Sequence, residues 1–158
     1  MIRLRHIQKA LVELLKSKYP TYKVYFDNVE KSNVPYFYVE MFVHTGIGDD
    51  TYFDRTVQID ITFRTMEDKQ GRIKRSELYD MSDSLECLIR PGFIVDDRHI
   101  TINDFEHTFM DEVLHFIFNL EFTDAFTDEE IGLVQGEVAQ TLSLHLNGMD
   151  LKEIEYGK

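Results

Sequence analysis

The stretch from Arg55 to Thr65, RTVQIDITFRT, carries the clearest structural signal in this sequence. Apolar and polar residues alternate along it, and a period of two residues predicts a β-strand with one buried face. A second extended run, Tyr36 to Val43, precedes it and is rich in aromatic and β-branched residues. The glycine-containing turn at 46–50 separates the two runs. We therefore expect them to pair as an antiparallel hairpin.

Two stretches outside this hairpin repeat apolar residues at three- and four-residue steps, which predicts amphipathic helices. The first runs from Ile2 to Lys18, and the second from about Lys74 to Arg90, where Pro91 ends it. Shorter extended runs lie at 23–26, 93–95, 99–102, 113–122 and 142–146, and the tight connection at 96–98 is consistent with a short hairpin of the second and third of these runs. We expect 113–122 to be a central strand. The order predicts an α+β fold with an N-terminal helix and one central helix packed on a mixed, mainly antiparallel sheet or sheets.

The length of 158 residues fits one domain, and we expect residues 1–158 to form it. The stretch 123–138 is acidic and irregular, which indicates either a mobile insert or a short capped helix. Residues 148–158 follow the last predicted strand and are expected to be a charged tail.

The chain carries 29 acidic and 17 basic residues, a formal net charge of -12. A surface of this sign repels phosphate, so we expect no direct grip on DNA or RNA. No run approaches the roughly 20 apolar residues of a bilayer span, and the first residues do not resemble a secretion signal, so we expect no membrane partner and a protein that is cytosolic when made. Cys87 is the one cysteine, which excludes an intrachain disulfide. We expect it to be buried as a small hydrophobe on the second helix.

The sequence offers no catalytic constellation that we can defend. It contains neither a glycine-rich phosphate loop nor a nucleophile elbow. The best candidate metal ligands are His99, Asp104, Glu106 and His107, whose spacing matches no metal motif. We therefore expect no catalytic residue, no cofactor and no metal.

Aromatic residues outside clear core positions are the remaining unusual feature. Aromatic side chains at turns and strand edges commonly anchor protein interfaces, although some will belong to the core. They are Tyr36, Tyr38, Tyr52, Phe53, Phe105, Phe109 and Phe126.

The ordered set of elements resembles the tail terminator family of bacteriophages and prophages. The first helix runs into YPTYKVYFD (19–27), and PYFYV (35–39) and YFDRTVQIDI (52–61) follow. SELYDM (76–81) and LHFIF (114–118) continue the similarity, which covers most of residues 1–147. The resemblance lies in element order and texture, because none of these stretches is an invariant signature.

The resemblance implies a structural protein that forms a hexameric ring on the last ring of the tail tube and also meets the head connector. It implies a protein of the virion tail–neck region, assembled in the host bacterial cytoplasm. Its expected partners are other copies of itself, the tail tube protein, the head connector or neck protein and, in a contractile tail, the terminal sheath ring. DNA would pass through an acidic lumen without specific binding, and six copies carry 6 × -12 = -72 formal charges.

We expect the hairpin tip, residues 46–54, to contact a neighbour or the tube. The candidate interface residues are Gly46, Asp49, Asp50, Tyr52, Phe53, Asp54 and Phe126. Two other hypotheses stay open: another neck or baseplate subunit, and a small metal-dependent enzyme or ligand-binding domain that uses His99 and His107.

Overall fold

The alternating stretch is confirmed as strand β3 (Tyr52–Arg64) in a computed structural model that describes residues 1–28, 32, 34–48, 51–127, 141–146 and 149–155. β3 pairs antiparallel with β2 (Tyr36–Ile47), as the sequence predicted. The register runs without a shift from Tyr36 opposite Arg64 to Ile47 opposite Phe53. On its other side β3 pairs antiparallel with β7 (Val113–Ala125), so β3 is the middle strand of the sheet.

Two edge strands complete a five-stranded sheet of order β1-β2-β3-β7-β6. The short β1 (Lys23–Tyr25) pairs parallel with the start of β2, and β6 (Phe105–Met110) pairs antiparallel with the start of β7. The prediction that 113–122 is a central strand is confirmed, because β7 lies between β3 and β6. Strand β6 was not predicted, since Glu106 and Thr108 make it a polar edge strand with a weak alternation.

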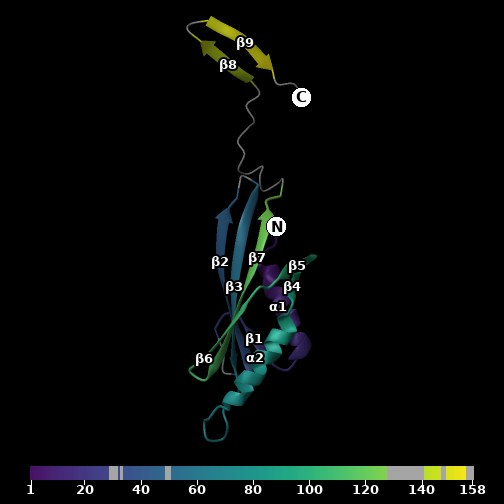
Figure 1. The fold of residues 1–158 in the computed structure, drawn as a ribbon, viewed down its shortest axis with the longest axis vertical. Coiled ribbons are helices and arrows are strands. Elements are labelled where there is room, and N and C mark those ends of the chain that lie inside the picture. Colours follow the sequence, from purple (N-terminus) through teal and green to yellow (C-terminus); the bar gives the residue numbers. More distant parts are fainter. Residues whose placement is uncertain (29–31, 33, 49–50, 128–140, 147–148, 156–158) are drawn as a thin grey trace. The chain divides into compact units, whose positions relative to one another are not determined.

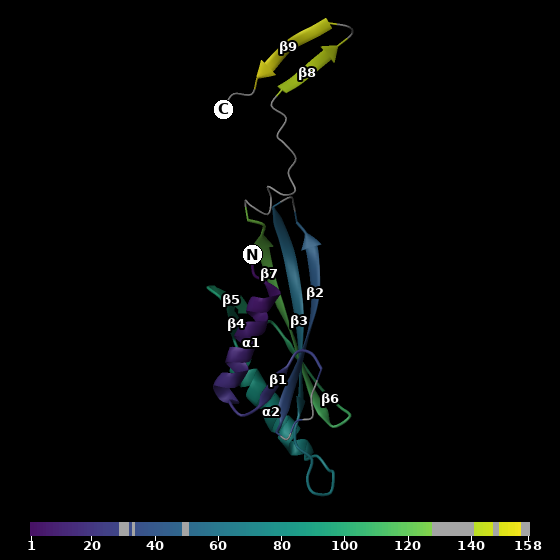
Figure 2. The same cartoon turned by 180° about the vertical axis from the view of Figure 1, so that it is seen from behind.

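Both predicted helices are confirmed, and they cover one face of the sheet. Helix α1 (Leu4–Lys18) and helix α2 (Arg75–Ile89) lie on the same side in both views (Figures 1 and 2). They pack against the buried sheet residues Phe37, Val39, Val57, Ile59, Ile61, Phe63, Leu114, Phe116, Phe118 and Leu120. The opposite face of the sheet carries no helix in the described part of residues 1–125 (Figure 2).

The predicted hairpin after the second helix is confirmed as β4 (Gly92–Val95) and β5 (Arg98–Thr101). The turn between them places Asp96 at φ 54, a left-handed conformation that aspartate tolerates better than most residues. His6 of α1 contacts this turn, with Nδ1 2.6 Å from Asp96 Oδ2. The hairpin therefore extends the layer that covers the sheet, on the same side as α1 (Figure 1).

The expectation of a buried Cys87 was wrong, because this residue is exposed. The buried side of α2 is formed by Leu78, Met81, Ser82, Leu85 and Ile89. Position 87 lies on the outer side of that helical stripe. Neither α1 nor α2, the helices of the described residues, has the length and apolar character that a bilayer span requires.

The chain divides into two compact units, Met1–Ala125 and Phe126–Lys158. In the second unit, β8 (Thr141–Leu146) pairs antiparallel with β9 (Met149–Glu155), with a register shift between Leu142 and Leu144. Strand β9 thus occupies part of the segment that we expected to be a charged tail. Of the expected acidic insert at 123–138, residues 123–125 belong to β7, and 128–138 lie outside the described residues.

Candidate interaction surfaces

The face of the sheet opposite α1 and α2 carries no helix in the described part of the first unit, and we call it the open face. Cross-strand register places four strands in common rows on it. One row is Glu40, Asp60, Ile117 and Glu106. Phe42 lies in the next row toward the hairpin tip, and Glu121 lies in the row after that. From the row of Tyr38 to the row of His44, both included, the open face therefore carries four carboxylates and no Lys or Arg.

A small polar cluster occupies the centre of the open face. His115 Nδ1 lies 3.0 Å from Asp60 Oδ2 and 3.2 Å from Thr62 Oγ1. The Asp60 side chain is 14% exposed, and its Oδ1 atom is buried without a hydrogen-bond partner among the described residues. A buried carboxylate oxygen without a donor is unfavourable, so Asp60 Oδ1 lowers the stability of this cluster.

Aromatic side chains border the same face near β1. The rings of Tyr25 and Tyr36 pack edge to face at 5.6 Å, and the Tyr25 hydroxyl is also buried without a partner in the described part of the chain. Phe42, farther along β2, is 55% exposed. Half-buried aromatics mixed with charged residues are typical of protein interfaces.

The hairpin tip brings together some of the predicted interface residues. Ile47, which the sequence analysis did not single out, is 90% exposed, and Tyr52 is 53% exposed. Phe53 is 2% exposed with the Arg55 guanidinium 4.8 Å from its ring centroid, so its ring is already covered within the subunit.

The other predicted interface residues have separate locations. Gly46 and Asp54 are opposite each other in the β2–β3 register. Asp49 and Asp50 lie outside the described residues. Phe126 belongs to the second compact unit and is 43% exposed.

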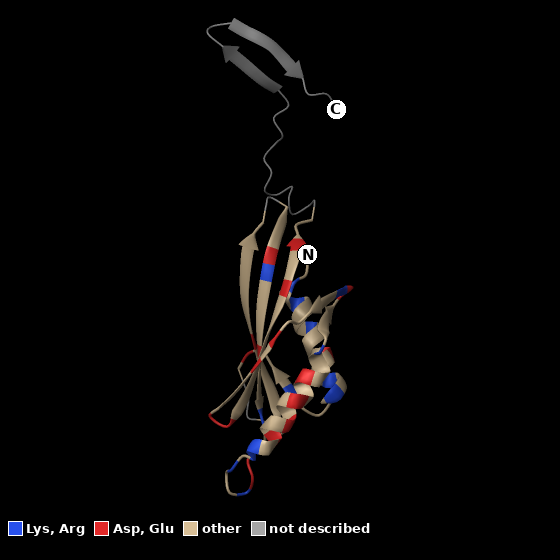
Figure 3. Ribbon diagram, viewed as in Figure 1, with Lys and Arg blue, Asp and Glu red and all other residues tan. Residues whose placement is uncertain are grey.

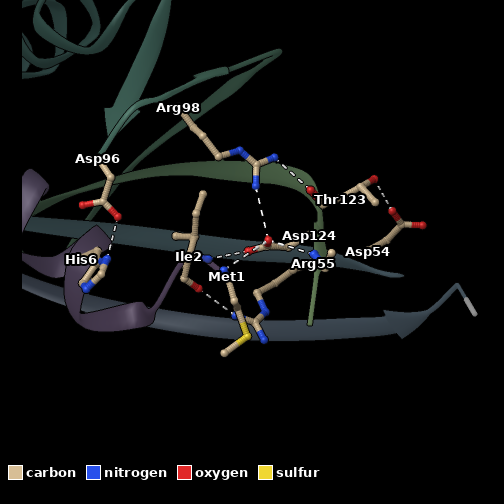
Figure 4. A network of polar contacts seen from close by, with 10 residues as sticks. Met1, Ile2, His6, Asp54, Arg55, Asp96, Arg98, Thr123 and Asp124 are labelled. Atoms are coloured by element: carbon tan, nitrogen blue, oxygen red, sulfur yellow. Dashed lines mark hydrogen bonds and ion pairs between the residues drawn. The ribbon is translucent and has the colours of Figure 1, made fainter. Parts of the chain in front are cut away.

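A polar network holds the end of β7 beside the hairpin tip (Figure 4). Asp124 Oδ2 accepts a hydrogen bond from Ile2 N at 2.5 Å, and Oδ1 accepts one from Ala125 N at 2.9 Å. Arg98 Nη1 lies 3.6 Å from Asp124 Oδ1, and its Nη2 donates to Thr123 O at 2.9 Å. The Asp124 side chain is 8% exposed, so its charge depends on these donors. The network fixes the start of the chain and β5 against β7.

The two helices carry opposite charge (Figure 3). Helix α2 contains Glu77, Asp80, Asp83 and Glu86 against Arg75. Helix α1 and the preceding Arg3 together carry five basic residues and one acidic residue: Arg3, Arg5, Lys9, Lys16 and Lys18 against Glu13. The protein has a net charge of -12, so the basic helix α1 separates a positive region from an otherwise acidic surface.

The candidate metal ligands do not converge in the structure. His99 is on β5 in the two-stranded sheet, whereas His107 is on β6 of the large sheet. His107 Nδ1 lies 2.6 Å from Ser82 Oγ, and its Nε2 lies 3.7 Å from Glu86 Oε2. Among the described residues, no three His, Cys, Asp or Glu side chains form a metal-binding group.

Sequence reasoning missed the open face because adjacency across strands depends on register. The sequence showed Asp60 on the polar side of β3. Glu40 joins it through the pairing of β2 with β3, and Glu106 joins it through the pairings of β3 with β7 and of β7 with β6. Ile47 lies within the predicted tip, but it was not chosen as an interface residue because an isoleucine is more often buried than exposed.

Comparison with known proteins gives one family. A family model described as phage tail terminator protein matches residues 6–132. Six solved protein chains match, and one of them is 15% identical, with a TM-score of 0.43, over 80% of this chain and 98% of its own length. No curated protein matches.

Proposed function

This chain belongs to the phage tail terminator protein family, and from that membership we propose that it closes the head-proximal end of the tail tube as a hexameric ring. The family is one of structural phage proteins, so the chain is a structural protein of the phage tail and a virion component. The observation that carries the proposal is the extent of the match, since residues 6–132 include α2, all five strands of the large sheet and all of α1 except its first two residues.

The ring ends tube polymerisation and joins the tail to the head connector or neck protein. In a contractile tail it also meets the terminal sheath ring. Assembly takes place in the host bacterial cytoplasm. Six subunits carry 6 × -12 = -72 formal charges, which supports passage of DNA through the lumen without specific binding.

The hairpin tip is the surface that we assign to contact with the tube or a neighbouring subunit. Ile47 and Tyr52 expose apolar area at the end of two long strands, and burying such area on a partner is favourable. The Asp124 network supports this role because it anchors the neighbouring end of β7, where Asp124 is opposite Phe53.

The experiment is capping of tail tubes assembled from purified tail tube protein, imaged by electron microscopy. We expect wild-type protein to occupy one tube end and to stop growth there. Ile47→Asp should weaken capping by at least about tenfold, because a desolvated carboxylate at an apolar contact costs about 2 kcal/mol or more. Ile94→Asp is the matched control, since Ile94 is 62% exposed on β4, which belongs to the separate two-stranded sheet.

Three outcomes count against the proposal in different ways. Wild-type protein that does not bind tube ends refutes the terminator function. Location at the distal end of whole particles favours a baseplate subunit, and location elsewhere in the neck favours another neck subunit. Equal capping by the Ile47 and Ile94 variants leaves the function intact and refutes the assignment of the tip.

A further inference from the structure

Two oppositely charged surfaces lie on opposite sides of the sheet and suit each other across two copies of the chain. We propose that the outer side of α1 in one subunit docks on the open face of the next subunit. This inference rests on the proposed ring and names the surfaces that build it.

The first surface is the outer side of α1, which is basic on an acidic protein. Residues 3–18 contain five Lys or Arg and one Glu, a net charge of +4, so the remaining residues carry -12 - 4 = -16. Lys16 and Lys18 donate to the carbonyl oxygens of Tyr22 and Ser84 within the subunit. Arg5 is exposed and has no acidic partner among the described residues, and Lys9 has only a surface pair with Glu13 at 3.8 Å. Arg5 and Lys9 are one helical turn apart, so they present two cations on one side.

The second surface is the open face, whose central rows contain Glu40, Asp60, Glu106 and Glu121 without any Lys or Arg. The buried Asp60 Oδ1 atom already lacks a donor within the described part of the subunit. That oxygen is buried and out of reach of a second copy, whose cationic side chains instead neutralise the exposed carboxylates Glu40, Glu106 and Glu121. The half-exposed Phe42 supplies apolar area in the adjacent row, as a mixed interface requires.

Placement on opposite sides of the sheet favours a head-to-tail contact. A closed ring needs two different, complementary patches on each subunit, so that each copy binds the next in the same way. Helix α2 is also acidic, but it lies on the same side of the sheet as α1. Pairing α1 with α2 turns two helical layers face to face, and such a contact closes on itself as a two-fold dimer when α2 of the first copy also meets α1 of the second.

The sizes of the two surfaces agree. Helix α1 has 15 residues and is about 22 Å long. Four neighbouring strands at roughly 4.8 Å spacing place the ends of the Glu40–Glu106 row about 14 Å apart. One helix thus spans the acidic row without leaving either end uncovered.

The test is a charge swap in the full-length protein. The variants are Arg5→Glu with Lys9→Glu, Glu40→Lys with Glu106→Lys, and all four substitutions together. Ring formation is measured by light scattering of free protein and by electron microscopy of capped tail tubes, at low and high salt. We expect each double variant to form rings at least about tenfold less well than wild type, and the combined variant to recover to within about threefold. Raising the salt should weaken the wild-type ring, since the contact is partly exposed.

Control variants separate this inference from general charge effects. Lys69→Glu lies in the exposed loop before α2, and Asp83→Lys lies on the outer side of α2. Both are expected to form rings like wild type. Unfolding in urea checks that each variant is folded.

The outcomes distinguish the two proposals. If wild type forms rings and both double variants form them equally well, this inference is overturned and the terminator function still stands. The same is true if Asp83→Lys abolishes the ring while Glu40→Lys with Glu106→Lys does not, which moves the contact to α2. Absence of any wild-type ring, free or on tubes, overturns the proposed function itself.

Discussion

Replacing Asp124 with Ala removes the acceptor that ties the start of the chain to the end of β7. Two backbone donors, Ile2 N and Ala125 N, lose a charged partner in a site where the side chain is 8% exposed. A hydrogen bond to a charged group contributes about 1.5–3 kcal/mol, and Ala125 N is near the strand end, where water partly replaces the lost acceptor. We expect the free energy of unfolding to fall by about 3 kcal/mol. For a unit of this size that lowers Tm by roughly 12 °C.

The assay is urea unfolding followed by far-ultraviolet circular dichroism. The midpoint should shift while the m-value stays constant, because the surface exposed on unfolding is unchanged. Asp124→Asn keeps one acceptor oxygen and should lose roughly half as much stability. The control is Asp104→Ala, an exposed residue whose substitution should change stability by less than about 0.5 kcal/mol. The reasoning fails if Asp124→Ala is as harmless as the control.

The remaining predictions concern a tight backbone approach and a buried phenol. Gly92→Ala places a Cβ atom 2.6 Å from Ile100 O, so we expect the free energy of unfolding in urea to fall by about 1–3 kcal/mol. Gly46→Ala is the control, because its nearest contact is 3.9 Å away and its free energy of unfolding should fall by no more than about 1 kcal/mol. An equal loss in the two variants contradicts the clash at Gly92. Burial raises the pKa of Tyr19 above 10.0, although the hydrogen bond to Ser84 Oγ opposes the rise. The neutral phenol therefore stabilises the fold below pH 10, and this contribution is lost as the pH rises through the folded-state pKa. Titration at 295 nm should show a late-ionising tyrosine that disappears in Tyr19→Phe, and an unchanged curve refutes the assignment.

Most of the large sheet could be predicted because its strands have strong local signals. Strand β3 alternates apolar and polar residues along most of its length, and the run at 36–43 is dense in aromatic and β-branched residues. Strand β6 was missed because an edge strand with polar residues has no such signal. Part of the expected charged tail became β9, since Met149, Leu151 and Ile154 alternate only irregularly with charged residues. Cys87 was misplaced because one helical position decides between burial and exposure.

The surfaces were less predictable than the fold. The sequence pointed to the hairpin tip, and Tyr52 there is indeed half exposed, but it gave no means of knowing that Phe53 packs beneath Arg55. The carboxylates of the open face come from β2, β3, β6 and β7, and only the strand register brings them together. Charge patterns that depend on long-range pairing require a structure, whereas periodicity along one strand does not.

The unbroken register between β2 and β3 also has a mechanical consequence. From Tyr36 to Ile47 every residue has a partner on β3, and β3 is held equally by β7. A pull along these strands loads all the ladder bonds in shear together, so no single bond must give way first. The hairpin is therefore stiff along its length, and a force on its tip is transmitted with little stretching to the part of the sheet that packs against the helices.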